Sequence, residues 1–200
     1  MKRILIFLMI IMGTASLSAQ TSGTILVPDN YVPPHKLEPS SFQKGIDTST
    51  DIIGVAMPLS ALIGSAVAGD WEGMKEFAFT AILAGGANIM LKYTVRELRP
   101  DHSNYNSFPS LHSTVAFGSA AFLQRRYGWK IGGPAYALAT YVAAGRVIAK
   151  KHHWWDCVVG AAIGAGSAYI FTKPWAKKHD FSMVPVANDE YVGLASQISF

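Results

Sequence analysis

The chain has 200 residues, enough for one domain with a hydrophobic core but too few for two sizeable domains plus a targeting segment. Half of the residues are hydrophobic and only 15% are charged, against about 25% in typical soluble domains, so the composition favours membrane association. The net charge of +4 suits an anionic partner, but the basic residues are scattered, which argues against nucleic acid. A single cysteine, Cys157, excludes an intrachain disulfide and a cysteine-rich metal site.

An export signal is predicted over residues 1–19. Lys2 and Arg3 precede an apolar run, and small residues end at Ala19, after which we expect cleavage. The alternative is an uncleaved first helix, although the apolar run is shorter than the ~20 residues that a bilayer needs. In either case the chain would start on the cytoplasmic side.

Residues 20–50 are polar and rich in proline, and we expect an irregular lead-in segment there. Apolar stretches that are too long for ordinary strands follow, and they predict five helices. These stretches cover residues 52–69, 77–91, 113–124, 131–149 and 157–172. We therefore expect an all-α domain over residues 51–172, a helical bundle of about five core helices, and a C-terminal tail over 173–200. Within the tail, residues 191–200 are compatible with a strand.

Charged residues in the connections predict how the bundle lies in a membrane, because cytoplasmic loops favour Lys and Arg. The basic residues expected on one face are Arg125, Arg126, Lys130, Lys173, Lys177 and Lys178. The opposite face receives loops 92–112 and 146–156, so these loops would face the periplasm of a bacterial inner membrane. The acidic loop 70–76 argues mildly against this orientation. Because several helices are short for a bilayer, a soluble periplasmic bundle remains the alternative.

The two loops on the predicted outer face contain nearly all the polar residues that could bind a ligand or take part in catalysis. A bound phosphoryl group needs fixed cations around its oxygens, and Lys92, Arg99 and Arg146 supply three. The turn Ser110-Leu111-His112 stands where the third helix is expected to begin, and backbone N–H groups at a helix start bind anions. The pattern is therefore that of a phosphate-binding site.

Phosphoryl transfer also needs a nucleophile and a group that protonates the leaving oxygen. Two histidines on the same face, His112 and His152, are able to divide these roles. Asp156 follows His152 by one helical turn, so its carboxylate is expected to hold the imidazole in the reactive tautomer. No plausible metal-ligand cluster is found outside these residues, so neither a metal nor another cofactor is predicted.

The candidate catalytic and phosphate-binding residues fall into three blocks whose order and spacing are specific. The blocks are Lys92 with six residues before Arg99-Pro100, then Pro109-Ser110-Leu111-His112, then Arg146 with five residues before His152 and three more before Asp156. This pattern resembles the tripartite motif of the type 2 phosphatidic acid phosphatase superfamily. That superfamily also includes bacterial class A acid phosphatases, lipid phosphate phosphatases and vanadium haloperoxidases.

The resemblance implies a role for each matched residue. His152 would be the nucleophile that becomes phosphohistidine, oriented by Asp156, and His112 would be the general acid. The phosphate would be held by Lys92, Arg99, Ser110, Leu111 and Arg146. Two positions depart from the family pattern: Leu111 replaces a glycine and Gly145 replaces a serine. The first change is expected to narrow the pocket, and the second removes a possible phosphate donor.

The resemblance and the hydrophobic core together predict a metal-independent phosphatase that acts on a lipid-linked phosphomonoester or pyrophosphate. Candidate substrates are phosphatidate, phosphatidylglycerophosphate, undecaprenyl pyrophosphate and a lipid A phosphate. The expected partners are this phosphorylated lipid and the membrane, with no nucleic acid. The main alternative is a soluble periplasmic acid phosphatase of the class A type with broad specificity. A vanadate haloperoxidase is less favoured because those chains are much larger, and a non-catalytic scaffold would not require so many charges near a membrane.

Overall fold

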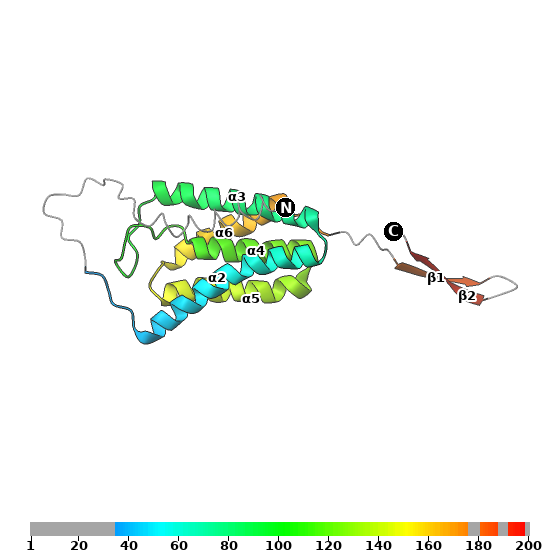
Figure 1. Ribbon diagram of the computed structural model, residues 1–200, viewed down its shortest axis with the longest axis horizontal. Coiled ribbons are helices and arrows are strands. Elements are labelled where there is room, and N and C mark those ends of the chain that lie inside the picture. The colour runs from blue at the N-terminus through cyan, green and yellow to red at the C-terminus, as the bar shows by residue number, and fades with distance from the viewer. Residues whose placement is uncertain (1–34, 176–180, 188–191, 199–200) are drawn as a thin grey trace.

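The computed structural model describes residues 35–175, 181–187 and 192–198. In this part of the chain, five α-helices lie side by side in a bundle and a β-hairpin follows them (Figure 1). The helices are α2 (Ser41–Val67), α3 (Trp71–Thr94), α4 (Leu111–Tyr127), α5 (Trp129–Ile148) and α6 (Trp154–Phe171). The hairpin pairs β1 (Phe181–Ala187) antiparallel with β2 (Val192–Ile198). The predicted all-α bundle with five core helices is confirmed, while residues 1–19 lie outside the described part.

Helix α4 forms the centre of the bundle and packs against each of the other four helices (Figure 1). Small residues make this possible, because Ala116, Ala120 and Ala121 are fully buried and leave room for neighbouring helices. Gly118 of α4 faces Gly164 of α6, and a Cβ at Gly118 would lie 3.4 Å from the backbone oxygen of Gly164. The core is thus made of closely approaching backbones as well as interlocking large side chains.

Helix α2 begins earlier than predicted, at Ser41 rather than near residue 52. A capping box starts it: Ser40 Oγ accepts from the Gln43 backbone N at 3.2 Å, and Gln43 Oε1 accepts from the Ser40 backbone N at 3.0 Å. The irregular lead-in expected over residues 20–50 is therefore wrong for residues 41–50, which are helical. Apolar periodicity missed residues 41–50 because most of them are polar, and Asp47 among them pairs with Arg146 of α5.

A buried ion network closes the end of the bundle where α4 ends and α3 begins, which we call the far end. Arg126 donates to both carboxylate oxygens of Asp70 and, at 3.2 Å, to Glu76. It also donates to the backbone oxygen of Lys173 at 3.0 Å, which ties the segment after α6 to the bundle. Asp70 and Glu76, two of the three acidic residues of segment 70–76, thus pair with Arg126, one of the basic residues predicted on the same face, and the third, Glu72, pairs with Lys75. Their presence no longer argues against that face being basic.

Candidate active site

The three sequence blocks meet at the opposite end of the bundle, which we call the site end and which lies at the left in Figure 1. The first block spans the end of α3 and loop 95–110, the second begins α4, and the third runs from the last turn of α5 to the first turn of α6. The fold therefore places all three blocks at one end, as predicted. The eight residues of these blocks are Lys92, Arg99, Ser110, Leu111, His112, Arg146, His152 and Asp156.

His152 lies in the short connection between α5 and α6 and is only 2% exposed. Its Nδ1 is 2.7 Å from the backbone oxygen of Ser107. A carbonyl oxygen only accepts hydrogen bonds, so Nδ1 carries the proton and Nε2 keeps its lone pair. Burial, together with the positive charges of Arg99 and Arg146, lowers the pKa of His152 to about 4 against the opposing effect of Asp156. The imidazole is therefore neutral near pH 7, which is its nucleophilic form.

Asp156 does not make the direct hydrogen bond to His152 that the sequence spacing suggested. Its Oδ2 lies 3.6 Å from His152 Nδ1, beyond hydrogen-bond range. The same oxygen instead accepts from Ser107 Oγ at 2.5 Å and from the His153 backbone N at 2.8 Å. Ser107 thus connects the pair: its carbonyl oxygen orients the imidazole and its hydroxyl is held by the carboxylate.

The three cations of the blocks are held in different ways. Lys92 Nζ donates to the backbone oxygens of Asn106 and Pro109, at 2.9 and 3.1 Å, and so fastens loop 95–110 to α3. Arg146 donates through one terminal nitrogen to Asp47 and Asp51, each at 2.7 Å. Within the described residues, the Nε atoms of Arg99 and Arg146 are buried and lack a hydrogen-bond partner. Two guanidinium groups therefore retain unused donors at the site end, as an anion-binding site requires.

The second block forms the N-terminus of α4. Ser110 is the N-cap and is fully buried, and its Oγ accepts from the Ser113 backbone N at 3.4 Å. Leu111 is the first helical residue, so its backbone N–H belongs to the first turn, where the helix dipole favours anions. His112 follows, with its Nε2 2.9 Å from Asp51 Oδ1. As the N-cap, Ser110 uses its hydroxyl oxygen as a hydrogen-bond acceptor. Its hydroxyl proton stays available to a ligand.

Gly145 has a packing role that its departure from the family motif did not suggest. A Cβ at this position would clash with Thr50 Cγ2 of α2 and would lie 3.1 Å from Ile46 Cγ2. The position therefore faces α2, and a serine would not fit without moving that helix. The structure thus gives a packing reason for the glycine, while the loss of a phosphate donor at this position stays a prediction.

Sequence reasoning missed several polar residues of the site, and their signals differ. Asp47 and Asp51 are one helical turn apart, where the polar first turns of α2 meet its apolar remainder, and a pair of carboxylates in such a setting is a detectable signal. Ser107 carries no comparable signal, because it acts largely through its backbone oxygen.

A further group of side chains surrounds Asp156. Glu97 and His153 bring ligand atoms within 4.8 Å of one another and of Asp156, close enough to hold a metal ion. Glu97 Oε1 already accepts from Trp155 Nε1 at 2.9 Å, and Asp156 Oδ2 accepts from Ser107. Both carboxylates are thus engaged by protein donors, and the group acts as a hydrogen-bonded support beneath His152.

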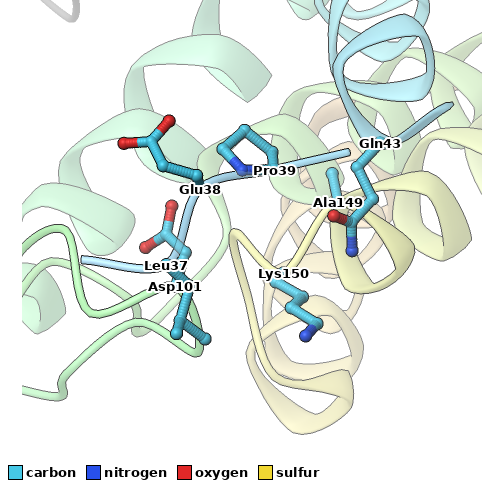
Figure 2. Close-up of a pocket in the computed structure, with 7 residues that line it drawn as sticks. All are labelled: Leu37, Glu38, Pro39, Gln43, Asp101, Ala149 and Lys150. Carbon is cyan, nitrogen blue, oxygen red and sulfur yellow. The ribbon is translucent and has the colours of Figure 1, made fainter. Parts of the chain in front are cut away.

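A shallow hollow beside the site is formed by other residues. The segment 37–43 crosses the loops there, and Figure 2 shows it between Asp101 and the turn of Ala149 and Lys150. The backbone N of Leu37 donates to the Asp101 oxygen at 2.9 Å, which fastens the crossing segment. None of the eight block residues lines this hollow, so it is distinct from the place where the three blocks meet.

Comparison with known proteins finds a family model that covers the three blocks. The family model described as PAP2 superfamily matches residues 74–180, which include all three blocks. The chain belongs to the PAP2 superfamily. This membership confirms the resemblance seen in the sequence, and together with the two lipid A phosphatase relatives described below it confirms the prediction of a phosphoric ester hydrolase. The match begins after α2, so Asp47 and Asp51 lie outside it.

Two PAP2 relatives carry related names. The chain is 29% identical over 135 residues to the Lipid A 4'-phosphatase of Helicobacter pylori, covering 62% of this chain and 68% of the relative. It is 33% identical over 87 residues to the Lipid A 1-phosphatase of Porphyromonas gingivalis, covering 41% of this chain but only 19% of that relative. The crystal structure of Aquifex aeolicus LpxE has a similar fold, with a TM-score of 0.58 and 22% identity over 64% of this chain and 84% of that one.

Proposed function

We propose that this PAP2 protein is a lipid phosphate phosphatase that transfers the phosphoryl group through His152 without a metal. The observation that supports it most strongly is the buried, neutral His152, whose free Nε2 shares the site end with two guanidinium groups that have unpaired Nε–H donors. A phosphate group satisfies both features, because its oxygens accept from guanidinium and its phosphorus accepts the attacking nitrogen.

In the first chemical step, Nε2 of His152 attacks phosphorus, an N–P bond forms and the P–O bond to the lipid breaks. His112 gives a proton to the departing lipid oxygen. Lys92, Arg99, Ser110, Arg146 and the Leu111 N–H hold the non-bridging oxygens, whose charge grows in the transition state. In the second step, water gives a proton to His112 and attacks phosphorus, the N–P bond breaks and inorganic phosphate leaves. His112 and His152 both return to their starting protonation states.

Exposed apolar side chains on the outer helices support a lipid substrate and a membrane location. Large exposed hydrophobic residues occur on α2, α3, α5 and α6, but none belongs to the central α4. Examples are Ile63 at 61%, Ile82 at 52%, Leu138 at 46% and Ile170 at 69% exposure. Water is an unfavourable surrounding for such a surface, and a bilayer is a favourable one. Of the described helices, α2 alone meets both the length and the apolarity expected of a membrane span.

Aromatic residues at the two ends of the bundle support the same membrane location. Trp71, Trp129 and Trp175 lie at the far end, and Trp154 and Trp155 lie at the site end, all partly or largely exposed. The 20 residues of α5 span about 30 Å, the thickness of a hydrocarbon core. Tryptophan is enriched at both membrane–water interfaces. We therefore propose that the site end lies at a membrane surface. We propose that this surface faces the periplasm of a bacterial inner membrane, because the basic residues of the far end favour the cytoplasmic side.

The substrate class we favour is a phosphate on an amphiphile of the lipid A type, because both named relatives are lipid A phosphatases. The other lipid phosphates and pyrophosphates named above have the same reactive group and remain within the proposal. A soluble acid phosphatase of broad specificity would have no use for the exposed apolar helix faces.

The test is phosphate release by the purified protein in detergent with EDTA, from lipid A, other lipid phosphates and water-soluble phosphomonoesters. We expect release from a lipid phosphate that exceeds release from soluble esters by at least ten-fold in kcat/KM. Equal or faster release from soluble esters would favour the acid phosphatase. The absence of release in EDTA, restored by a divalent cation, would contradict the metal-independent mechanism.

A further inference from the structure

Asp51 of α2 bridges two residues of the phosphate site. Its Oδ1 lies 2.9 Å from Nε2 of His112 and 2.7 Å from a terminal nitrogen of Arg146. The Asp51 side chain is 55% exposed, the His112 side chain 32% and the Arg146 side chain 5%. The carboxylate therefore lies at the mouth of the site, between the proposed general acid and a proposed phosphate-binding residue.

The packing of α2 around Asp51 is close, so the bridge is more than a chance meeting of surface side chains. A Cβ at Gly54, one turn after Asp51, would lie 3.1 Å from His112 Cδ2, so the glycine lets the helix lie against the imidazole. On the other side, Gly145 leaves space for Thr50. Two glycines thus allow α2 to approach both partners of Asp51.

The carboxylate does not take up the donors that a phosphate needs. Asp47 and Asp51 share one terminal nitrogen of Arg146, while the buried Nε of that residue is free. On His112, the bond to Asp51 uses Nε2 and leaves Nδ1 for other partners, since no hydrogen bond of Nδ1 occurs in the described structure. His112 therefore keeps its Nδ1, and Arg146 keeps its Nε, for the substrate.

We propose that Asp51 is a positioning residue that holds His112 by its Nε2–H and so assigns proton transfer to Nδ1. The inference rests on the proposed function. When the lipid oxygen departs, Nδ1 gives up its proton, and the neutral ring that remains is the Nε2–H tautomer that a carboxylate acceptor stabilises. In the second step the same Nδ1 takes a proton from water. A third group that orients the acid–base histidine is a recurring arrangement in group-transfer sites.

A double-mutant cycle tests this inference on the best substrate of the wild type, with kcat/KM as the readout because it reports the first chemical step. Asp51→Asn keeps the shape of the side chain but replaces the acceptor charge. We expect a loss of about ten-fold or more, carried by kcat, and bounded by the roughly 10²–10⁴-fold that acid–base catalysis contributes. In a His112→Gln background, Asp51→Asn should cause less than about a two-fold further loss, because its effect acts through His112.

Asp47→Asn is the matched control, since Asp47 contacts Arg146 from the same helix but makes no contact with His112. Its effect should appear in KM and should be as large in the His112→Gln background as in the wild type. An equal loss from Asp51→Asn in both backgrounds would overturn the inference. A lower KM with unchanged kcat would also overturn it, because the carboxylate would then merely occupy the place of a phosphate oxygen.

A second variant distinguishes the loss of positioning from a folding defect. Asp51→Ala leaves a half-exposed space beside His112, into which a small carboxylate such as formate fits. We expect formate to raise kcat/KM of Asp51→Ala several-fold without raising that of the wild type, at equal melting temperatures. The absence of this rescue in a folded variant would contradict a positioning role. Failure of the wild type to release phosphate from any ester would instead contradict the proposed function itself.

Discussion

At the residue scale, the arrangement around His152 depends on a residue that has no motif signal. The sequence spacing suggested that Asp156 contacts His152 across one helical turn, but α6 begins only at Trp154. His152 therefore precedes the helix, and the spacing of four residues does not bring the two side chains into hydrogen-bond range. Ser107 fills the gap, with its carbonyl oxygen on Nδ1 of His152 and its hydroxyl on Asp156.

Ser107→Ala separates these two contacts, because the backbone oxygen that orients His152 remains while the hydroxyl is lost. The buried Asp156 carboxylate would lose its 2.5 Å donor, and a charged group that loses a hydrogen bond costs about 1.5–3 kcal/mol. We expect a fall in kcat of about ten-fold or more and a lower melting temperature. Steady-state kinetics and thermal melting measure both effects, and unchanged values for both would contradict the role given to Ser107.

The depressed pKa of His152 predicts how stability changes with pH. Its pKa is about 4 in the folded protein and about 6.5 when unfolded, so the unfolded chain binds more protons between these values. This contribution to stability is fully present above about pH 6.5 and is lost as pH falls toward 4. Thermal melting of the wild type should therefore decline more steeply over this range than melting of His152→Gln. Parallel melting curves for the two proteins would show that the residue is not buried as neutral imidazole.

That the block residues meet at one end of the bundle could be predicted from the order of the helices, whereas their contacts could not. Lys92 illustrates the difference, since it was predicted to hold phosphate and the structure shows it also holding two loop carbonyls. Asp51 went unnoticed because it lies outside the three blocks, at the first residue of the predicted helical domain. Contacts between distant segments depend on three-dimensional packing, which a single sequence does not contain.

At the element scale, the close contact of α4 with α6 fixes the relative position of the second and third sequence blocks. Gly164 is buried against α4, and a Cβ there would clash with the backbone oxygen of Thr114. Gly160, one turn closer to the site, likewise faces the Ser110 backbone oxygen at the N-cap of α4. The distance between the second and third blocks is therefore set by glycines.

Gly164→Ala tests this contact, and Gly166→Ala in the same helix is its control because a Cβ at Gly166 would meet no atom within 4 Å. Backbone atoms cannot rotate away as side chains do, so Gly164→Ala should destabilise the protein by about 3 kcal/mol. It should also lower activity by displacing Ser110 relative to His152. Melting temperature and kcat/KM provide the readouts. Equal behaviour of the two variants would contradict the close packing of α4 and α6.

The helices themselves could be predicted in number and order from the lengths of the apolar stretches, but their starts could not. Helices α3 and α6 begin at Trp71 and Trp154, earlier than the apolar pattern indicated. Their first turns contain polar residues that cap the helix or support the site. Asp70, for example, caps α3 through the Gly73 backbone N at 2.9 Å and also binds Arg126.

At the scale of the whole molecule, charged networks at both ends enclose an apolar middle. The network of Arg126 at the far end joins α3, α4 and the segment after α6. Near the site end, Arg146 joins α2 to α5. Between these ends, the outer helices present apolar side chains. This distribution of charge is the one expected of a small bundle that spans a bilayer.

Arg126→Met tests the far end, with Lys130→Ala as the control because Lys130 is an exposed residue of the same region. The substitution would leave the buried carboxylates of Asp70 and Glu76 without their cation, which costs about 3–5 kcal/mol. We expect a markedly lower melting temperature, with the kcat of the remaining folded protein unchanged since the site lies at the other end. A melting temperature equal to that of Lys130→Ala would contradict this account.

The measurement that tests the central claim most directly is trapping of the phosphoryl group on His152. The purified protein would be mixed with a lipid substrate that carries radiolabelled phosphate and quenched in alkali, where phosphohistidine survives. We predict label on the wild-type chain and none on His152→Ala, together with a loss of phosphate release of at least about 10³-fold in that variant. A His152→Ala protein that is still labelled, or that still releases phosphate at the wild-type rate, would contradict transfer through this histidine.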